Sequence, residues 1–430
     1  MKETVITEKK KPFLFSGVWG KLLVFLSVFG PATITAMADN DAGGVATYSL
    51  AGATLGYPIL TLLLVITVLL GITQEMGMRL TIVTRRGLAD LIRERWGVRT
   101  SVLIFGALFF ANVACTVTDL AAVKTTSALF NLPAIPAVIV VVAFTFFFIT
   151  RGNYRQTEKI MLFSSLFFLT YVVSAVMAKP DWGLAISNLF YPHGAEATPD
   201  YLRNYLIIGM GVLGTTITPW GQFFISSFAY DKKIERGKVS YSQIETYVGA
   251  FITDFFSFFM IVATAATLFV RKIPLTDGTT AAMAIAPFAG RLAGILFAVG
   301  ILNAGFMGFV VISLSTAYAF AEFFGIPGSL NDTYRESPTF YTLFLIQILL
   351  SFFIVILPGI DLFKVALFSQ VVNAIALPLV LYFLIRLASD KSLMGEYANT
   401  KFQIYFSTIS AVVIAIAAFF TVAAVFFPPK

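Results

Sequence analysis

The 430-residue chain contains one cysteine, Cys115, and one histidine, His193. A single cysteine excludes a disulfide scaffold and a cysteine-rich metal site. A single histidine excludes a metal site built from several histidines. Charged residues are also scarce, because they form only 12% of the chain, whereas soluble domains carry about 25%. These deficits exclude a soluble enzyme.

Apolar residues are what the chain has in excess. They form 58% of the sequence, and phenylalanine alone occurs 45 times. The formal net charge is +7, but the Lys and Arg residues lie between apolar runs, where membrane proteins place them. The charge therefore does not predict nucleic-acid binding, and the composition predicts a chain whose main partner is the lipid bilayer.

Eleven apolar runs are long enough to cross a membrane, since one helical span needs about 20 mainly apolar residues. None shows the alternation in segments of about 10 residues that is typical of barrel strands. We therefore expect an all-α integral membrane protein with about 11 transmembrane helices. The runs are 21–54, 57–83, 100–130, 133–149, 157–178, 201–229, 244–270, 286–321, 337–357, 361–387 and 403–427.

The distribution of basic residues predicts the orientation. With the N-terminus in the cytoplasm, 22 of the 30 Lys and Arg fall in inside segments and seven in outside segments, with Lys124 in a span. This excess on one side predicts a multi-pass protein of the plasma (inner) membrane with its N-terminus inside and its C-terminus outside. Residues 1–20 are expected to be a basic cytoplasmic tail.

Two of the eleven spans are interrupted in the middle. Residues 39–44 (DNDAGG) place two carboxylates and a glycine pair inside the first span, and residues 214–221 (GTTITPWG) place a proline inside the sixth. Paired interruptions in corresponding halves indicate a transporter with inverted repeats. We expect 21–178 and 201–387 to be two five-helix repeats, with 403–427 as an additional helix.

The interruptions predict a cation site. Unwound backbone at membrane depth frees carbonyl oxygens and is tolerated only inside protein or beside water. Together with Asp41 and Asp39, these oxygens suit a hard cation. Two alternatives remain open. In one, the carboxylates are solvated or structurally paired, for example with Lys124. In the other, the Thr218 hydroxyl only bonds its own helix.

At these residues the sequence resembles the Nramp family of divalent-metal transporters. Gly30-Pro31 and residues 41–47 (DAGGVAT) resemble the family's GP…DPGNWAT stretch, and residues 214–220 (GTTITPW) resemble GATVMPH. Six further blocks agree in order, namely 87–96, 118–123, 179–182, 369–372, 377–378 and 389–395. The resemblance implies a LeuT-like fold of two five-helix repeats with broken helices 1 and 6, and transport by alternating access.

The resemblance also implies a ligand set, in which this chain departs from the family. The family's site matches Asp41, Gly44, Thr215 and Thr218, and Gln370 can join it. Thr218 replaces a methionine, Gly44 replaces an asparagine, and Asp39 replaces a bulky aromatic residue. We expect a harder, more acidic and roomier site, to which Asn40 and Asn373 add amide oxygens.

Such a site suits partly hydrated Mg²⁺, because Mg²⁺ prefers oxygen ligands and dehydrates reluctantly. The chain in this respect resembles the Nramp-related magnesium transporters, a divergent branch. We expect Mg²⁺ as the transported ion, with Mn²⁺ as a second one, and no bound cofactor.

The residues that match the family's proton path are mostly not titratable. Trp220 and Ile225 stand where the family has histidines, and Asn112 and Ala122 stand at acidic positions, whereas Asp119 is kept. We therefore expect transport without proton coupling. Inward movement of a divalent ion through 100 mV releases about 4.6 kcal/mol, which suffices for uptake. Asp119 is expected to pair with Lys124, or to be a remnant of the proton path.

The sequence favours three other functions less. An ordinary proton-coupled Mn²⁺/Fe²⁺ transporter is disfavoured by the missing methionine and histidines. A Na⁺-coupled symporter of an organic solute is disfavoured because two carboxylates would repel an anionic substrate group. An intramembrane enzyme is disfavoured because no paired catalytic motif is present. The protein is expected to be a monomer, with Gln74 and Glu75 solvated at the cytoplasmic end of their span.

Overall fold

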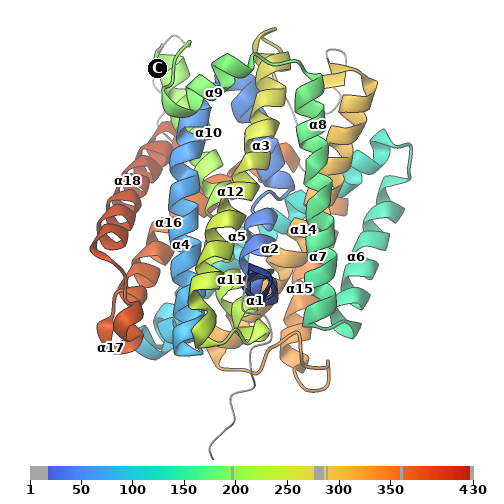
Figure 1. The fold of residues 1–430 in the computed structure, drawn as a ribbon. Coiled ribbons are helices and arrows are strands. Elements are labelled where there is room, and N and C mark those ends of the chain that lie inside the picture. The colour runs from blue at the N-terminus through green and yellow to red at the C-terminus, as the bar shows by residue number, and fades with distance from the viewer. Residues whose placement is uncertain (1–17, 195–197, 276–284, 287–288, 359–361, 427–430) are drawn as a thin grey trace, which may run out of the picture.

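The computed structural model describes residues 18–194, 198–275, 285–286, 289–358 and 362–426, and these residues form a bundle of helices (Figure 1). The described residues contain no β-strand, as the all-α expectation requires. In chain order the α-helices are α1 (Val18–Val28), α2 (Pro31–Ala38), α3 (Ala42–Leu55), α4 (Ile59–Thr84), α5 (Leu88–Leu129), α6 (Ala134–Arg151), α7 (Tyr154–Ser165), α8 (Leu169–Met177), α9 (Trp182–Phe190), α10 (Pro199–Thr216), α11 (Pro219–Lys232), α12 (Val239–Thr264), α14 (Arg291–Phe324), α15 (Pro338–Ile356), α16 (Leu362–Ala388), α17 (Lys391–Met394) and α18 (Lys401–Phe426).

Nine helical segments in the described part of the chain are long and apolar enough to span a membrane. Two of them join neighbouring elements: α7 continues through the 3-10 turn Leu166–Phe168 into α8, and α12 continues into the π-turn Ala265–Phe269. The two expected spans that are missing from these nine are the first and the sixth. They are missing because each is divided into two shorter helices, α2 with α3 and α10 with α11.

The first apolar run differs from the expectation of one span over 21–54. It contains a separate helix, α1, which ends at Val28. Gly30 then adopts a positive φ of 146°, which only glycine tolerates easily, and Pro31 begins α2 without a backbone N–H. The chain therefore turns at Gly30-Pro31, and α1 is seen almost end-on in Figure 1.

The third span begins earlier than the expected residue 100. Helix α5 starts at Leu88 and bends at Gly97, whose φ is 81°. The segment before this bend contacts the α16–α17 connection, where the Arg95 guanidinium pairs with the Asp390 carboxylate. Asp390 also accepts bonds from the Ser392 hydroxyl and backbone N–H, and these contacts, with Arg95, lower the pKa of Asp390 to about 2.

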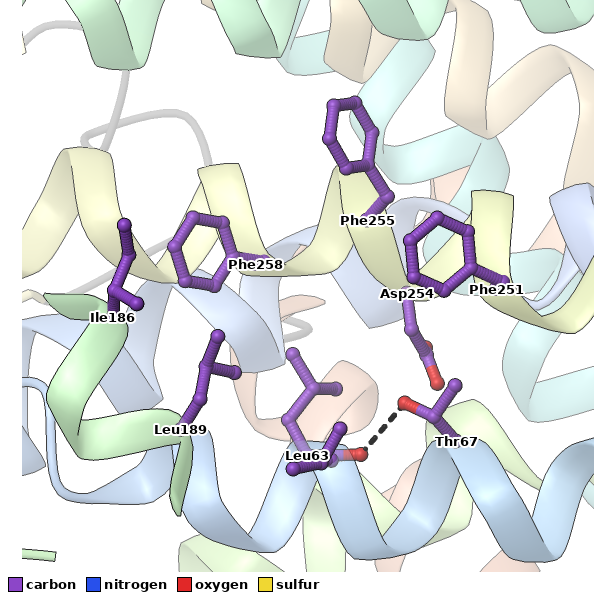
Figure 2. A pocket seen from close by; sticks show the side chains of 9 residues that line it. Leu63, Thr67, Ile186, Leu189, Phe251, Asp254, Phe255 and Phe258 are labelled. Atoms are coloured by element: carbon purple, nitrogen blue, oxygen red, sulfur yellow. Dashed lines mark hydrogen bonds between the residues drawn. The ribbon is translucent and has the colours of Figure 1, made fainter. Parts of the chain in front are cut away.

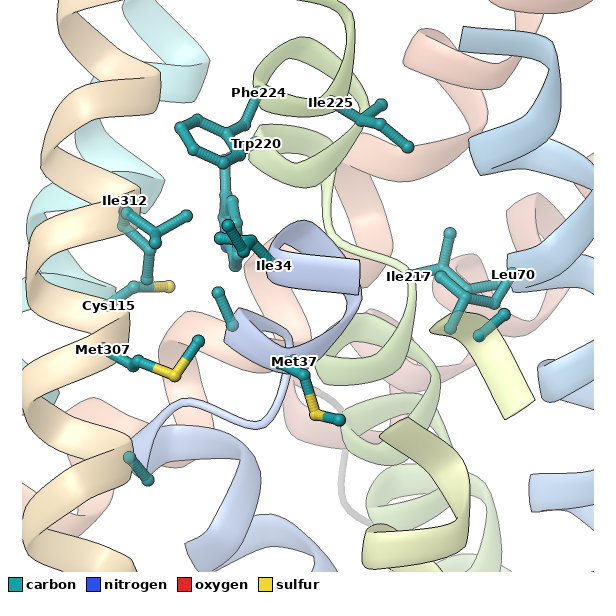
Figure 3. Close-up of a cluster of buried hydrophobic side chains, with 14 of the residues drawn as sticks. Ile34, Met37, Leu70, Cys115, Ile217, Trp220, Phe224, Ile225, Met307 and Ile312 are labelled. Carbon is teal, nitrogen blue, oxygen red and sulfur yellow. The ribbon is translucent and has the colours of Figure 1, made fainter. Parts of the chain in front are cut away.

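The broken helices lie inside the bundle. Helix α12 packs against α2, α3 and α4, and α14 packs against α5 and α11. Helices α6 and α18 flank the bundle at its two sides in Figure 1, and only 22% of each apolar window is buried. Figure 3 shows buried apolar side chains around the breaks, among them Ile34 and Met37 of α2 and Trp220 and Phe224 of α11. The interrupted segments are therefore enclosed by protein.

Candidate cation site at the two helix breaks

Asp41 ends the first break and begins α3. Its backbone is extended, and its Oδ1 accepts a hydrogen bond from the Gly44 N–H, so Asp41 is the N-cap of α3. An aspartate is among the preferred residues at this position, because its oxygen satisfies a free backbone donor and its charge suits the helix N-terminus. The sequence DNDAGG thus forms a break in which a carboxylate caps the helix that follows.

Thr218 is likewise an N-cap residue, at the second break. The chain leaves helical geometry at Ile217, and Thr218 then caps α11 by accepting a bond from the Gly221 N–H at 3.0 Å. Pro219 follows at the first helical position, where its missing N–H costs nothing. The Thr218 hydroxyl donates its own hydrogen to Asp39 Oδ1 at 2.8 Å. One side chain therefore caps α11 and joins the two breaks.

Asp39 is the centre of the contacts between the breaks. Its Oδ2 accepts a hydrogen bond from Gln74 Nε2 of α4 at 3.0 Å. Its backbone carbonyl lies 3.4 Å from the Thr215 hydroxyl, which donates to it. Gln74 is fully buried here, although we expected it in water at the end of its span. The signal that would have found it is an amide in the middle of an apolar helix.

Helix α16 supplies two amides to the site. Gln370 Nε2 donates to Asp41 Oδ1 at 3.4 Å. Asn373, one turn later, donates to Gln370 Oε1 at 3.2 Å and to Cys115 Sγ at 3.4 Å. Asn373 therefore touches Gln370 directly and reaches the Asp41 carboxylate only through it.

Asp119 of α5 lies against the first break. Its Oδ1 accepts a hydrogen bond from the Ala42 N–H at 3.0 Å, whereas its Oδ2 has no hydrogen-bond partner among the described residues. Gly308 of α14 makes this approach possible, since a β-carbon there would lie 2.6 Å from both Asp119 Oδ2 and Asp41 Cβ. Asp119 thus belongs to the same cluster as Asp41.

The structure places the Asn40 amide away from this cluster. Asn40 Nδ2 donates to the backbone carbonyl and hydroxyl of Thr253, and Asn40 Oδ1 accepts from the Ser257 hydroxyl at 2.8 Å. Both polar ends of Asn40 are therefore bonded to α12. The expectation that Asn40 adds an oxygen to the cation site is corrected, because the turn of the break points its side chain to the opposite side.

Gly44 does not leave the free space that we expected. A β-carbon on Gly44 would lie 2.7 Å from the Thr215 hydroxyl and 2.9 Å from the Asp39 carbonyl oxygen. The room that a larger side chain would take is therefore filled by α10. In the described conformation the site is tight at Gly44.

The residues that match the family's proton path lie in different surroundings. Asn112 donates to the Thr316 hydroxyl at 2.9 Å, and the Trp220 carbonyl accepts from the Ser315 hydroxyl at 2.9 Å. Ile225 packs on Gly77 of α4, and Ala122 packs near Gly305 of α14. Of this set, only Asp119 contacts a broken helix through a titratable side chain.

The expected ion pair between Asp119 and Lys124 is not formed. Lys124 Nζ donates instead to the Val355 carbonyl at 2.7 Å. The spacing of five residues explains the difference, because neighbours on one helix face are three or four residues apart. Asp119 faces the break, while Lys124 points to the end of α15.

The cluster consists of oxygen atoms that are suited to bind a cation and are shielded from water. Asp39, Asp41 and Thr218 are each 2% exposed. Carboxylate, hydroxyl, amide and carbonyl oxygens are the ligands that hard cations prefer. In the residues that the structure describes, no three His, Cys, Asp or Glu side chains gather into a metal-binding group. A cation held here would therefore take a mixed set of neutral oxygens and a few carboxylates.

Comparison with known proteins identifies relatives over almost the whole chain. The family model described as natural resistance-associated macrophage protein-like (Nramp) matches residues 32–424. The divalent metal cation transporter MntH of Verminephrobacter eiseniae is 26% identical over 403 residues, which cover 90% of this chain and 87% of that protein. MntH of Deinococcus radiodurans is 26% identical over 413 residues, with 92% and 89% covered.

Solved structures show the same fold. A manganese transporter of Eremococcus coleocola, in complex with an aromatic bis-isothiourea substituted compound, matches with a TM-score of 0.79 and 19% identity over 97% of this chain and 90% of that one. Mhp1, a nucleobase-cation-symport-1 family transporter, matches with a TM-score of 0.54 and 15% identity over 93% of each chain. The expected LeuT-like fold is confirmed by these likenesses.

Proposed function

Because this chain belongs to the natural resistance-associated macrophage protein-like (Nramp) family, we propose that it transports divalent metal cations across a membrane, with Mg²⁺ preferred and Mn²⁺ as a second substrate. The curated relatives are divalent metal cation transporters, and they are matched over most of their length. The function is transport and not catalysis.

One observation carries the choice of ion: the residue that caps α11 at the break of the sixth span is a threonine, and its hydroxyl bonds the Asp39 carboxylate at 2.8 Å. A thioether sulfur at this position would favour soft, late transition metals, whereas a hydroxyl oxygen does not. Asp39 adds a second carboxylate next to Asp41 and so increases the negative charge of the site. The donors are consequently those that suit Mg²⁺.

The proposed ligands are Asp41 and Asp39, with the Thr218 hydroxyl, Gln370 and backbone oxygens near Thr215 as neutral partners. An ionised carboxylate has about four lone-pair positions, so each aspartate retains acceptor capacity beside the bonds it already accepts. The contacts among Asp39, Thr218 and Gln74 hold these oxygens in place. Gly44 keeps the two helix breaks close together. Asn373 supports Gln370.

We further propose that transport is not coupled to protons. A proton relay requires titratable groups within reach of one another. Asn112, Ala122, Trp220 and Ile225 supply none of these groups, and residues 340–357 carry no charge. The membrane potential supplies about 2.3 kcal/mol per charge at 100 mV, which drives a divalent ion inward without a coupled proton.

A second candidate is a proton-coupled transporter of Mn²⁺. Asp119 favours it, because this carboxylate lies beside the first break and one of its oxygens has no partner among the described residues. In this alternative Asp119 exchanges a proton while the ion moves.

The test uses the full chain in proteoliposomes that contain both a Mg²⁺ dye and a pH dye, with a negative potential inside. Entry of Mg²⁺ without acidification is the expected result. Entry of Mn²⁺ alone, with acidification, would overturn both the ion preference and the absence of coupling. Vesicles with Asp41→Asn measure the leak that does not pass through the site.

The organisation of the chain in the membrane is part of the same proposal. Residues 21–178 and 201–387 are proposed as the two inverted repeats, with 403–427 as an added helix. The protein is proposed to act as a monomer in the plasma membrane with its N-terminus in the cytoplasm and its C-terminus outside. Attaching a membrane-impermeant label to a cysteine introduced at His193 tests this orientation, because His193 is then outside.

A further inference from the structure

A cavity of about 260 Å³ lies at the side of the bundle. It is formed by α4, α9 and α12, and Figure 2 shows its lining side chains. All of these side chains are apolar except Thr67 and Asp254. The lining residues are Leu63, Leu64, Thr67, Ile186, Leu189, Phe251, Asp254, Phe255 and Phe258.

Asp254 lies at one end of this cavity, near the hydroxyls of Thr67 and Ser257. Its residue is 4% exposed, and neither carboxylate oxygen accepts a hydrogen bond from the described residues. Figure 2 shows the carboxylate directed toward Thr67. The Thr67 hydroxyl, however, donates its hydrogen to the Leu63 carbonyl at 2.8 Å. A buried carboxylate without such bonds is costly, and a bound cation would offset this cost.

The cavity opens sideways, at the depth of the membrane. Thr67 lies about 12 Å from the start of α4 at Ile59, given a rise of 1.5 Å per residue. The rim side chains Leu64, Ile186, Phe251 and Phe255 are exposed. On a membrane-spanning helix such exposed apolar side chains face lipid. A ligand therefore enters from the hydrocarbon phase and must itself be largely apolar.

We propose that this cavity binds lipophilic organic cations, namely amines with an aromatic or alkyl body, whose ammonium group pairs with Asp254. A divalent metal does not fit, since it requires about six oxygen ligands and the cavity offers one carboxylate and one hydroxyl. An anion is excluded by the charge of Asp254. The apolar walls suit the body of the ligand, because a cavity of about 150 Å³ already holds benzene.

The residues beside Asp254 connect the cavity to the first helix break. Thr253 and Ser257, on the same helix, hold both polar ends of Asn40. Asn40 lies between Asp39 and Asp41 in the chain. A ligand that fixes α12 at Asp254 therefore restrains the segment that must move during transport. We expect occupancy of the cavity to slow uptake of divalent ions.

Binding is tested with 4-phenylbutylamine and its neutral counterpart 4-phenylbutanol, by calorimetric titration of the full chain in nanodiscs. Empty nanodiscs correct for partition into lipid. The amine is expected to bind the native chain at least about tenfold more tightly than the alcohol, which corresponds to about 1.4 kcal/mol. Asp254→Asn keeps the size of the side chain and is expected to remove this difference.

Two further variants keep the test decisive. Leu189→Trp fills the cavity without touching the carboxylate and is expected to abolish binding of both compounds. Glu235→Gln removes one negative charge from a side chain that is 75% exposed and is expected to leave amine binding unchanged.

The proposal is overturned if the native chain binds amine and alcohol equally. It is also overturned if Asp254→Asn binds the amine within twofold of the native chain. If Asp254→Asn does not fold, the native comparison and Leu189→Trp decide, because neither depends on that variant. This proposal does not rest on the identity of the transported metal.

Discussion

The hydroxyl of Thr218 donates a hydrogen bond of 2.8 Å to the carboxylate of Asp39 and so links the two broken helices. The two residues are 179 positions apart in the chain, and each lies where its own helix is interrupted. The same hydroxyl caps α11 through the Gly221 N–H. Movement of one break relative to the other must therefore alter the bond, the cap or both.

Asp41→Asn is expected to abolish divalent-ion uptake while the fold is kept. Asparagine is as good an N-cap as aspartate, so α3 retains its bond from the Gly44 N–H, but the site loses a charge. The loss of uptake should exceed the roughly 10–100-fold that removal of a supporting residue costs at metal sites. Initial rates of Mg²⁺ and Mn²⁺ uptake in proteoliposomes, with melting temperatures alongside, measure both effects.

Glu336→Gln is the matched control for that change. Its side chain is exposed in the loop before α15, and among the described residues its carboxylate accepts bonds only from Thr333. Normal uptake by Glu336→Gln and none by Asp41→Asn is the expected pair of results. Full uptake by Asp41→Asn would remove this carboxylate from the transport site.

Thr218→Met is expected to change the ion preference. A thioether replaces a hydroxyl, so competition by Cd²⁺ and Mn²⁺ against Mg²⁺ should increase by about tenfold. The variant also loses the cap of α11, which costs about 1 kcal/mol of stability. Thr218→Ser keeps both hydroxyl bonds and should behave as the native chain. An unchanged ion ranking in Thr218→Met would contradict the role given to this oxygen.

Gly308→Ala is expected to reduce uptake strongly, because its β-carbon would lie 2.6 Å from Asp41 Cβ and from Asp119 Oδ2. Either α14 or the first break has to shift. Gly106→Ala is the matched control, since a β-carbon there has no atom within 4 Å and alanine favours a helix by about 1 kcal/mol over glycine. Uptake rates of the two variants are compared at equal protein amount, and equal rates would contradict the close packing at Gly308.

Glu245→Ala is expected to loosen the start of α2. Glu245 Oε1 accepts bonds from the Gly30 and Thr33 N–H groups at 2.9 and 3.0 Å, and from the Thr33 hydroxyl. Each buried donor left without a partner costs about 1–3 kcal/mol. Hydrogen–deuterium exchange should therefore rise in peptides that cover residues 30–36. Glu245→Gln retains an acceptor oxygen and should show a smaller rise; unchanged exchange in Glu245→Ala would exclude this cap.

Much of the architecture is predictable from local features of the sequence. The long apolar runs, together with the scarcity of charge, predict the helical membrane fold. The carboxylates and glycines at 39–44 and the proline at 219 predict where the first and sixth spans break, and the structure breaks there. These are short-range effects, because caps, prolines and glycines act on the backbone within a few residues.

What surrounds the breaks was decided by tertiary packing. The sequence predicts Gln74 in water, but Gln74 bonds Asp39. It predicts Asn40 at the site, but Asn40 bonds α12. Lys124 bonds α15 rather than Asp119. Each of these contacts depends on which face of one helix packs against another helix. In a sequence without charge periodicity, that face cannot be predicted from the pattern of residues. The amino-acid sequence by itself determined that oxygen-rich breaks occur inside the membrane. Only the packing of helices distant in the chain decided which side chains complete them, because hydrogen bonds buried in a bundle are set by helix rotation and depth.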